Sequence, residues 1–249
     1  MTAQSDTAAR PQTLSQILFS QGFGTRRHVA ALIASGKVQI DGEVCDEPAR
    51  TWPTEGLVFE VGGVRWLYQP SALVMLHKPV GFECSVKPRH HPSVLGLLPA
   101  PLRERGVQPV GRLDADTSGL LLLSDDGGLI HRLTSPKHHV HKVYEVGCKH
   151  ALAPDSVARL LSGVVLDDDP APVQAVACAA TGSHALRMTL TEGRYHQVKR
   201  MVAAVGNRVE SLHRSAIGAL PLGAELPAGQ WRWVDAAERE ALFRPGCSG

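Results

Sequence analysis

One stretch, VGRLDADTSGLLLLSDDG at residues 110–127, restricts the folds open to this chain more than any other. Two glycines and a proline stand within the eight residues before Asp114, and these residue types oppose a helix. Four consecutive leucines, residues 120–123, follow, and such a run is typical of a buried strand. We therefore expect residues 114–119 to form a polar turn within a β-rich domain.

The same turn has nearly the spacing of a calcium-binding loop. Counted from Asp114, oxygen-bearing side chains stand at positions 1, 3, 5 and 12, with glycine at position 6. A calcium loop of this type needs a helix on each side, and its position 9, often a polar ligand, would be Leu122. Calcium binding is therefore disfavoured. A plain polar turn and a chemically active carboxylate both remain open.

The wider chain predicts an α+β fold with a small basic module in front of a larger mixed domain. Residues 14–22 and 25–35 are typical of two short helices, with Thr25 as the N-cap of the second. A hairpin should follow, with strands at 37–40 and 43–45 joined by an Asp41-Gly42 turn. Further strands are expected at 72–79, 119–124, 142–148 and 185–193, and further helices at 155–163 and 195–206.

These patterns give five segments along the 249 residues. We expect a disordered tail over 1–12, the small module over 13–68, a linker over 69–72, the larger domain over 73–243 and a second tail over 244–249. The larger domain should be built on a mixed, mostly antiparallel sheet with flanking helices.

Composition limits the class of protein without naming a partner. The net charge of +2 does not by itself indicate a nucleic-acid binder. The five cysteines are scattered, odd in number and form no CxxC pair, which favours reduced thiols in a cytoplasmic protein over a disulfide framework. No apolar run is long enough for a membrane span, and the N-terminus lacks the apolar core of a secretory signal.

Two other stretches accompany the carboxylate turn: SPKHHVHKVYEV at 135–146 and EGRYHQVKRM at 192–201. In order and separation, the three stretches resemble the motifs of pseudouridine synthases, and most closely those of the RsuA-like group, which acts on small-subunit ribosomal RNA. KPVGFECS at 78–85 and HPSVLGLL at 91–98 are similar to that group's entry into the catalytic domain. Residues 13–68 resemble the alpha-L RNA-binding module that precedes it.

The resemblance assigns roles to particular residues. It implies that Asp114 is the catalytic aspartate and that Lys199 is the basic residue that forms an ion pair with it. Burial alone would raise the pKa of a carboxyl group, so an ionised aspartate in a partly dry pocket needs such a partner. Tyr144 matches the tyrosine that stacks on the target base, and Asp116 and Thr117 are expected to hold the turn in shape through side-chain caps.

Several cations are expected to contact RNA. Arg112 matches the arginine that fills the space left by a flipped base; otherwise it would form a surface salt bridge, for example with Asp116. Arg26 and Arg27 stand at a helix N-terminus, where cations oppose the helix dipole, so phosphate binding explains them better than stability does. The remaining predicted RNA contacts lie where positive charge gathers around the second and third motifs, at Lys142, Arg194 and Arg200.

The histidines His138, His139 and His141 raise the question of zinc. On a strand, alternate residues face the same side, so only His139 and His141 could act together, and no cysteine or carboxylate cluster completes a ligand set. We expect no metal and no cofactor.

The predicted function is isomerisation of a specific uridine in 16S ribosomal RNA by a monomeric cytoplasmic enzyme, acting on free RNA or on the assembling small subunit. Two alternatives remain open: a synthase for 23S ribosomal RNA, and a non-catalytic RNA-binding assembly factor. An intact set of Asp114, Tyr144 and Lys199 favours an enzyme, because binding alone needs no carboxylate beside phosphates.

Overall fold

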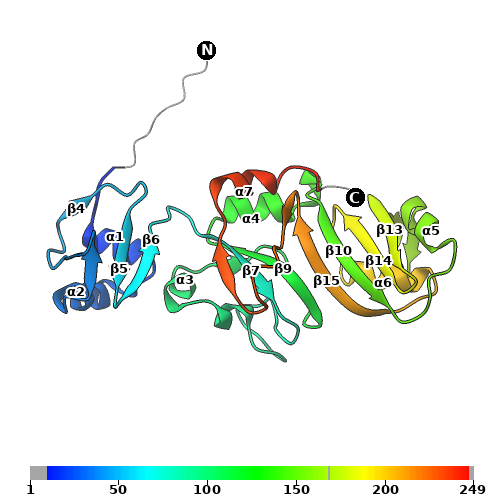
Figure 1. The fold of residues 1–249 in the computed structure, drawn as a ribbon, viewed down its shortest axis with the longest axis horizontal. Helices are drawn as coiled ribbons and strands as arrows, with labels where there is room; N and C mark the ends of the chain where they lie inside the picture. Colours follow the sequence, from blue (N-terminus) through cyan, green and yellow to red (C-terminus); the bar gives the residue numbers. More distant parts are fainter. Residues whose placement is uncertain (1–9, 168, 247–249) are drawn as a thin grey trace, which may run out of the picture. The chain divides into compact units, whose positions relative to one another are not determined.

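The computed structural model describes residues 10–167 and 169–246, which form two units. The first comprises the chain up to Ala72 together with Leu98–Val107, and the second comprises Leu73–Leu97 and the chain from Gln108 onward. Most of the tails expected over 1–12 and 244–249 lie outside the described residues. Figure 1 shows the helices and strands of each unit along the chain.

The N-terminal unit combines three short helices with small antiparallel sheets. In the sheet of four strands the order is β3-β2-β5-β6, and β1 pairs with β4. Its elements are β1 (Gln12–Thr13), α1 (Leu14–Ser20), α2 (Arg26–Ala34), β2 (Val38–Ile40), β3 (Glu43–Val44), β4 (Thr51–Trp52), β5 (Val58–Val61), β6 (Val64–Leu67) and α3 (Ala100–Glu104).

Local sequence signals explain where these elements begin and end. Thr13 and Thr25 each accept a hydrogen bond from the backbone three residues on, and so cap α1 and α2. The turn between β2 and β3 has positive φ at Asp41 and Gly42, as its Asp-Gly sequence predicts. The predicted helices and hairpin of this unit are therefore confirmed. Ile17, Ile33 and Phe59 lie in its core, each at most 1% exposed.

The second unit is built on one large sheet with the strand order β13-β14-β10-β15-β9-β7-β17. All neighbouring pairs on this path are antiparallel except β9 and β15, which run parallel. Its strands are β7 (Leu73–Lys78), β8 (Gln108–Pro109), β9 (Thr117–Ser124), β10 (Lys142–Cys148), β11 (Val164–Leu166), β12 (Asp169–Val173), β13 (Ala177–Gly182), β14 (Ala185–Leu190), β15 (Val209–Ile217), β16 (Leu220–Pro221) and β17 (Trp231–Trp233).

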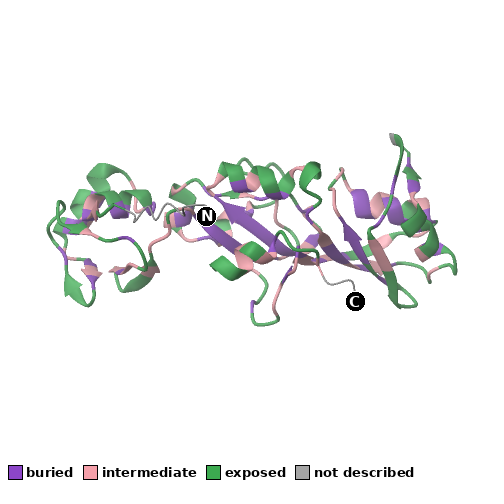
Figure 2. Ribbon diagram, turned by 90° about the horizontal axis from the view of Figure 1, so that it is seen from above, coloured by how far each residue is buried: buried purple, intermediate pink, exposed green. Residues whose placement is uncertain are grey.

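The helices of this unit are α4 (Gly127–Thr134), α5 (Ser156–Ser162), α6 (Gln197–Ala204) and α7 (Ala236–Ala241), with 3-10 turns at Val94–Leu97 and Pro136–His138. Leucines of α4 pack with Leu120 and Leu122 of β9 and with Leu242 beyond α7 in one apolar cluster. All four leucines of residues 120–123 are fully buried, because both faces of β9 are covered. Figure 2 shows the central strands of the sheet among the buried parts of the chain. The expected α+β class with a mixed, mostly antiparallel sheet is confirmed.

One local expectation was wrong, and several elements were missed. Residues 136–138 form a 3-10 turn and His139 has a left-handed backbone, so the three histidines do not lie on a strand; β10 begins only at Lys142. The sequence also gave no clear indication of α3, α4, α7 or β15. Strand β15 has a mixed burial pattern and a bulge opposite β10, which removes the regular alternation by which strands are recognised.

Candidate active site

A buried lysine binds the backbone of the turn that carries Asp114. Lys78, at the end of β7, is 0% exposed, and its Nζ donates to the carbonyl oxygens of Asp114 and Thr117 at 3.0 and 2.7 Å and to that of Pro79 at 3.0 Å. Burial lowers the pKa of Lys78 below its usual value. A buried ammonium needs several acceptors to offset its lost hydration, so these carbonyls fix the backbone path of the turn.

Just after the turn, a glycine in β9 allows this strand to pass close to a neighbouring strand. Gly119 has φ +111°, and a Cβ atom there would overlap the backbone of Arg214 on β15. Arg214 is 2% exposed, and its Nε donates to the carbonyl oxygen of Leu120 at 2.8 Å. The close approach of β9 and β15 therefore brings the aspartate turn and Arg214 together.

The Asp114 carboxylate faces two basic side chains. Its Oδ2 accepts from Lys199 Nζ at 3.0 Å, and its Oδ1 lies 3.4 Å from Nε2 of His196. About a third (32%) of the Asp114 side chain is exposed, so the carboxylate is held but accessible. The ion pair between Lys199 and Asp114 that the resemblance implied is present in the structure.

Lys199 also binds a second carboxylate. Its Nζ lies 2.7 and 2.9 Å from the two carboxylate oxygens of Asp116. Burial favours the neutral form of each partner, but the hydrogen bonds between them outweigh it: the pKa of Asp116 is lowered and that of Lys199 is raised. The side chain of Asp116 is therefore engaged by Lys199 and not by Arg112.

Thr117 contributes differently from the prediction. Its Oγ1 is buried without a hydrogen-bond partner among the described residues, so it caps nothing. The backbone of Thr117 stabilises the turn instead: its N–H donates to the Asp114 carbonyl oxygen at 3.1 Å, and its carbonyl oxygen accepts from Lys78.

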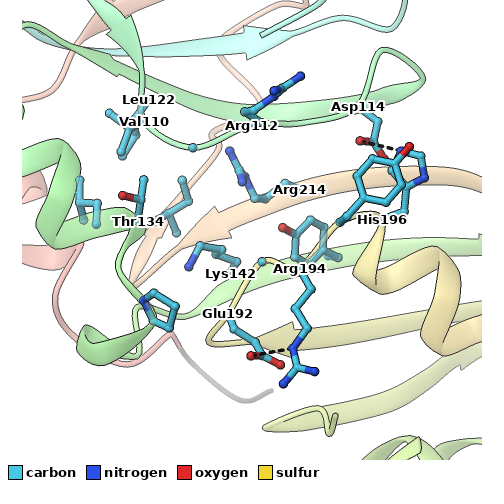
Figure 3. A pocket seen from close by; sticks show the side chains of 17 residues that line it. Val110, Arg112, Asp114, Leu122, Thr134, Lys142, Glu192, Arg194, His196 and Arg214 are labelled. Atoms are coloured by element: carbon cyan, nitrogen blue, oxygen red, sulfur yellow. Dashed lines mark hydrogen bonds and ion pairs between the residues drawn. The ribbon is translucent and has the colours of Figure 1, made fainter. Parts of the chain in front are cut away.

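A cavity of about 500 Å³ opens beside Asp114, within the range of small-molecule sites. Tyr144 of β10, only 8% exposed, contributes to its wall. Figure 3 shows Asp114 and His196 at one end and Val110, Leu122 and Thr134 at the other. Between these ends the head groups of Lys142 and Arg214 point toward the apolar end.

The segment before α6 forms one edge of the cavity, and sequence reasoning assigned no role to three of its residues. His196 has a left-handed backbone at the start of α6, and its ring stacks on that of Tyr195 at 3.8 Å between centroids. Tyr195 is 76% exposed. Glu192 lies 3.3 Å from Arg194 and accepts from Gln197 at 3.0 Å. All three lie within the quoted motif at 192–201, which was the available signal.

The other predicted contacts fall into two groups. Arg112, Lys142 and Arg194 line the cavity. Arg200 contacts a residue of the cavity edge: its Nη1 donates to the carbonyl oxygen of Tyr195 at 3.1 Å. Arg26 and Arg27 lie in the first turn of α2 in the N-terminal unit, where the guanidinium of Arg26 lies 5.7 Å from the centre of the Phe19 ring.

The described residues, 10–167 and 169–246, contain neither a candidate metal-binding cluster nor a candidate membrane-spanning helix. Among them, no three His, Cys, Asp or Glu side chains are grouped so that they could hold a metal ion. Within the same residues, no helix has the length and apolar character needed to cross a membrane. The four described cysteines (Cys45, Cys84, Cys148 and Cys178) are free thiols.

Comparison with known proteins decides the family. Residues 72–204, more than half of the chain, match the model of the family described as RNA pseudouridylate synthase, and residues 12–51 match the S4 domain. The chain belongs to the RNA pseudouridylate synthase family. This pseudouridine synthase is 37% identical over 233 residues to the ribosomal small subunit pseudouridine synthase A of Yersinia pestis, covering 93% of this chain and 98% of that protein.

Other relatives agree. The protein of the same name from Escherichia coli K12 is 37% identical over 215 residues, which cover 86% of this chain and 92% of that protein. A crystal structure of a pseudouridylate synthase superimposes with a TM-score of 0.66 at 32% identity, covering 92% of this chain and 99% of that one. The predicted enzyme class, an RNA pseudouridine synthase with an N-terminal S4 domain, is thus confirmed.

Proposed function

We propose that this pseudouridine synthase isomerises a specific uridine of 16S ribosomal RNA, with Asp114 as the catalytic carboxylate. The observation that carries the proposal is the Asp114 side chain itself, which is bound by Lys199 and His196 yet open to the cavity that Tyr144 lines. Relatives named for the ribosomal small subunit support the choice of RNA.

The reaction needs few groups. The C1′–N1 bond of the uridine breaks, the base turns within the pocket, C5 bonds to C1′, the proton at C5 leaves, and N1 takes up a proton. Asp114 acts on the ribose, either as a nucleophile at C1′ or as a base that removes a ribose proton and later returns it, and its ion pair with Lys199 holds the carboxylate in place for either role. The ring of Tyr144 stacks on the extruded base, and its hydroxyl is available for proton transfer at C5.

The RNA is held around this site by cations. Arg112 takes the space that the flipped base leaves in the RNA, and Lys142, Arg194 and Arg200 contribute positive charge near the cavity. In the module over 13–68, Arg26 and Arg27 bind phosphate. We place the linker at 69–72 and the catalytic domain over 73–243 apart from residues 98–107, which belong to the N-terminal unit. We also propose that the enzyme acts as a monomer in the cytoplasm.

The test is pseudouridine-specific chemical mapping of 16S and 23S ribosomal RNA, and of immature small-subunit particles, after reaction with three proteins. These are the wild type, Asp114→Asn, and Asp155→Asn as a matched control, because Asp155 is an exposed aspartate of the same unit away from the cavity. We expect one new pseudouridine in 16S RNA with the wild type and the control, and none with Asp114→Asn.

Other outcomes would change the proposal in defined ways. A site in 23S RNA would keep the chemistry and overturn the substrate. Binding of RNA without modification of any of these substrates would favour an assembly factor. Full activity of Asp114→Asn would overturn the role of the carboxylate.

A further inference from the structure

Two cations between the ends of the cavity, Lys142 and Arg214, are not used by the proposed roles of Asp114, Tyr144 and Lys199. Arg214 is 2% exposed and lines the cavity, and its Nη2 has no hydrogen-bond partner among the described residues. Lys142 lines the same cavity, and its Nζ donates to the Val140 carbonyl oxygen at 2.9 Å. Buried polar groups are normally hydrogen-bonded, so an unpartnered guanidinium nitrogen in a cavity indicates a ligand.

No acid neutralises this pair within the described chain. The carboxylates that line the cavity are engaged elsewhere: Glu192 by Arg194, and Asp114 by Lys199 and His196. Burial and the neighbouring Arg214 lower the pKa of Lys142 to about 8, the direction expected for two uncompensated like charges. Keeping the pair costs stability, and a ligand with negative charge would offset that cost.

The walls around the pair favour a base over a phosphate. Leu122, Leu133 and Ile217, which belong to one apolar cluster, line the cavity, and Figure 3 shows the head groups of Lys142 and Arg214 pointing toward Val110, Leu122 and Thr134. A nucleotide whose ribose lies at Asp114 reaches inward with its base, whereas its phosphates stay on the solvent side. The group that meets the two cations is then the uracil ring.

We propose that Lys142 and Arg214 bind the uracil carbonyl oxygens and stabilise the negative charge that the base acquires during the reaction. When C1′–N1 breaks, its electron pair goes to the base, which becomes a uracil anion with charge shared by N1, O2 and O4. The ribose either forms a bond from C1′ to Asp114 or gives a proton to it. C5 then supplies the electron pair of the new bond to C1′. Where C1′ was bonded to Asp114, that bond breaks and its electrons return to the carboxylate; where Asp114 had taken a proton from C2′ of the ribose, it returns that proton to C2′. The proton at C5 then leaves to a base and N1 takes up a proton, so that the product is an isomer of the uridine. This inference rests on the proposed function.

The role differs from the RNA-backbone contact that the sequence suggested for Lys142. A backbone contact acts mainly on affinity for RNA, whereas stabilisation of a leaving group acts on the chemical step. A cation aimed at developing charge in a water-poor site typically changes the rate by about 100-fold or more.

The test compares single-turnover rates and RNA dissociation constants for wild type, Lys142→Met, Lys142→Arg and Arg214→Lys. Lys149→Met is the matched control, because Lys149 is an exposed lysine just beyond the same strand. We expect Lys142→Met to lower the rate about 100-fold with little change in RNA affinity, Lys142→Arg to recover at least a tenth of the wild-type rate, and Lys149→Met to keep the wild-type rate. Arg214→Lys should also lower the rate and leave RNA affinity unchanged.

A loss of RNA affinity at an unchanged rate would overturn the inference in favour of a phosphate contact. Equal losses in Lys142→Met and Lys142→Arg would overturn it in favour of a packing role.

A binding measurement separates this inference from the proposed function: 5-nitrouracil, an anion at neutral pH, should bind the wild type more tightly than uracil does. Lys142→Met should lose that preference and Lys149→Met should keep it, even if none of the RNAs tested is the true substrate. Equal binding of 5-nitrouracil and uracil by the wild type would overturn the inference.

Discussion

Lys199 holds two carboxylates that would otherwise face each other without a cation between them. Its Nζ lies 3.0 Å from Oδ2 of Asp114 and 2.7 Å from Oδ1 of Asp116. Replacement by methionine keeps much of the apolar stem and removes the charge. We expect the rate of the chemical step to fall, because the Asp114 carboxylate then lies next to another carboxylate with only His196 opposite it.

The size of the effect follows from the distance and the exposure. Two unit charges 3.0 Å apart in a medium of effective dielectric constant near 20 attract by roughly 5 kcal/mol. Solvent reaches 32% of the Asp114 side chain and 71% of the Asp116 side chain, and screens much of this. Exposed pairs are worth below about 1 kcal/mol and broken buried pairs cost about 3–5, so we take an intermediate value of about 2 kcal/mol. That corresponds to a fall in rate of about 30-fold.

The assay is the single-turnover rate of pseudouridine formation with enzyme in excess, for Lys199→Met, Asp116→Asn and the double variant. Asp116→Asn alone should change the rate little. In the Lys199→Met background it should raise the rate, since it removes the repulsion, and the two changes should therefore not be additive. A Lys199→Met rate within twofold of the wild type, or strictly additive losses, would refute the electrostatic reasoning.

Three further predictions concern stability. Lys78→Met should lower the free energy of unfolding in urea by about 3 kcal/mol, because carbonyls of the aspartate turn lose their buried donor; a loss below about 1 kcal/mol would contradict this. Gly119→Ala should cost about 2–4 kcal/mol and lower the melting temperature, because φ is positive and the new Cβ overlaps the backbone of Arg214; an unchanged melting temperature would show that the strands separate freely. The pKa of Lys142 is about 8 in the folded protein and higher when unfolded, so from pH 8 to 10 the unfolded state binds more protons. The stability of the wild type relative to Lys142→Met should therefore rise over that interval in paired urea titrations, and a fall would reverse the assigned direction.

The electrostatic layout of the cavity separates two tasks. At one end, Lys199 and His196 hold the Asp114 carboxylate, and positive and negative charges meet directly. Farther along the cavity, Lys142 and Arg214 form no ion pair within the described chain. A site that uses a carboxylate and also stabilises an anionic leaving group requires one cation paired with the carboxylate and other cations left unpaired for the leaving group. The two sets must lie apart, so that the carboxylate does not neutralise Lys142 and Arg214.

The sequence by itself determined the local structure that depends on near neighbours. Thr13 and Thr25 cap their helices, Asp41-Gly42 forms its turn and the four leucines form a buried strand, because these preferences arise within a few residues. The three motifs also sufficed to indicate the family, and the resemblance that they carry is what predicts Asp114, Tyr144 and Lys199 as site residues.

Only the tertiary structure decided which side chains meet. Lys78 and Asp114 are 36 residues apart, and Arg214 and Leu120 are 94 apart, so their contacts depend on strand pairing that no local pattern specifies. Because of its bulge, β15 lacks the regular alternation by which a strand is recognised in a sequence, and this strand carries Arg214. The same holds for His196, whose left-handed backbone brings its ring to Asp114, and for the uncompensated charge of Lys142. Both features arise only when distant elements pack, because burial and the distance between side chains are properties of the whole fold.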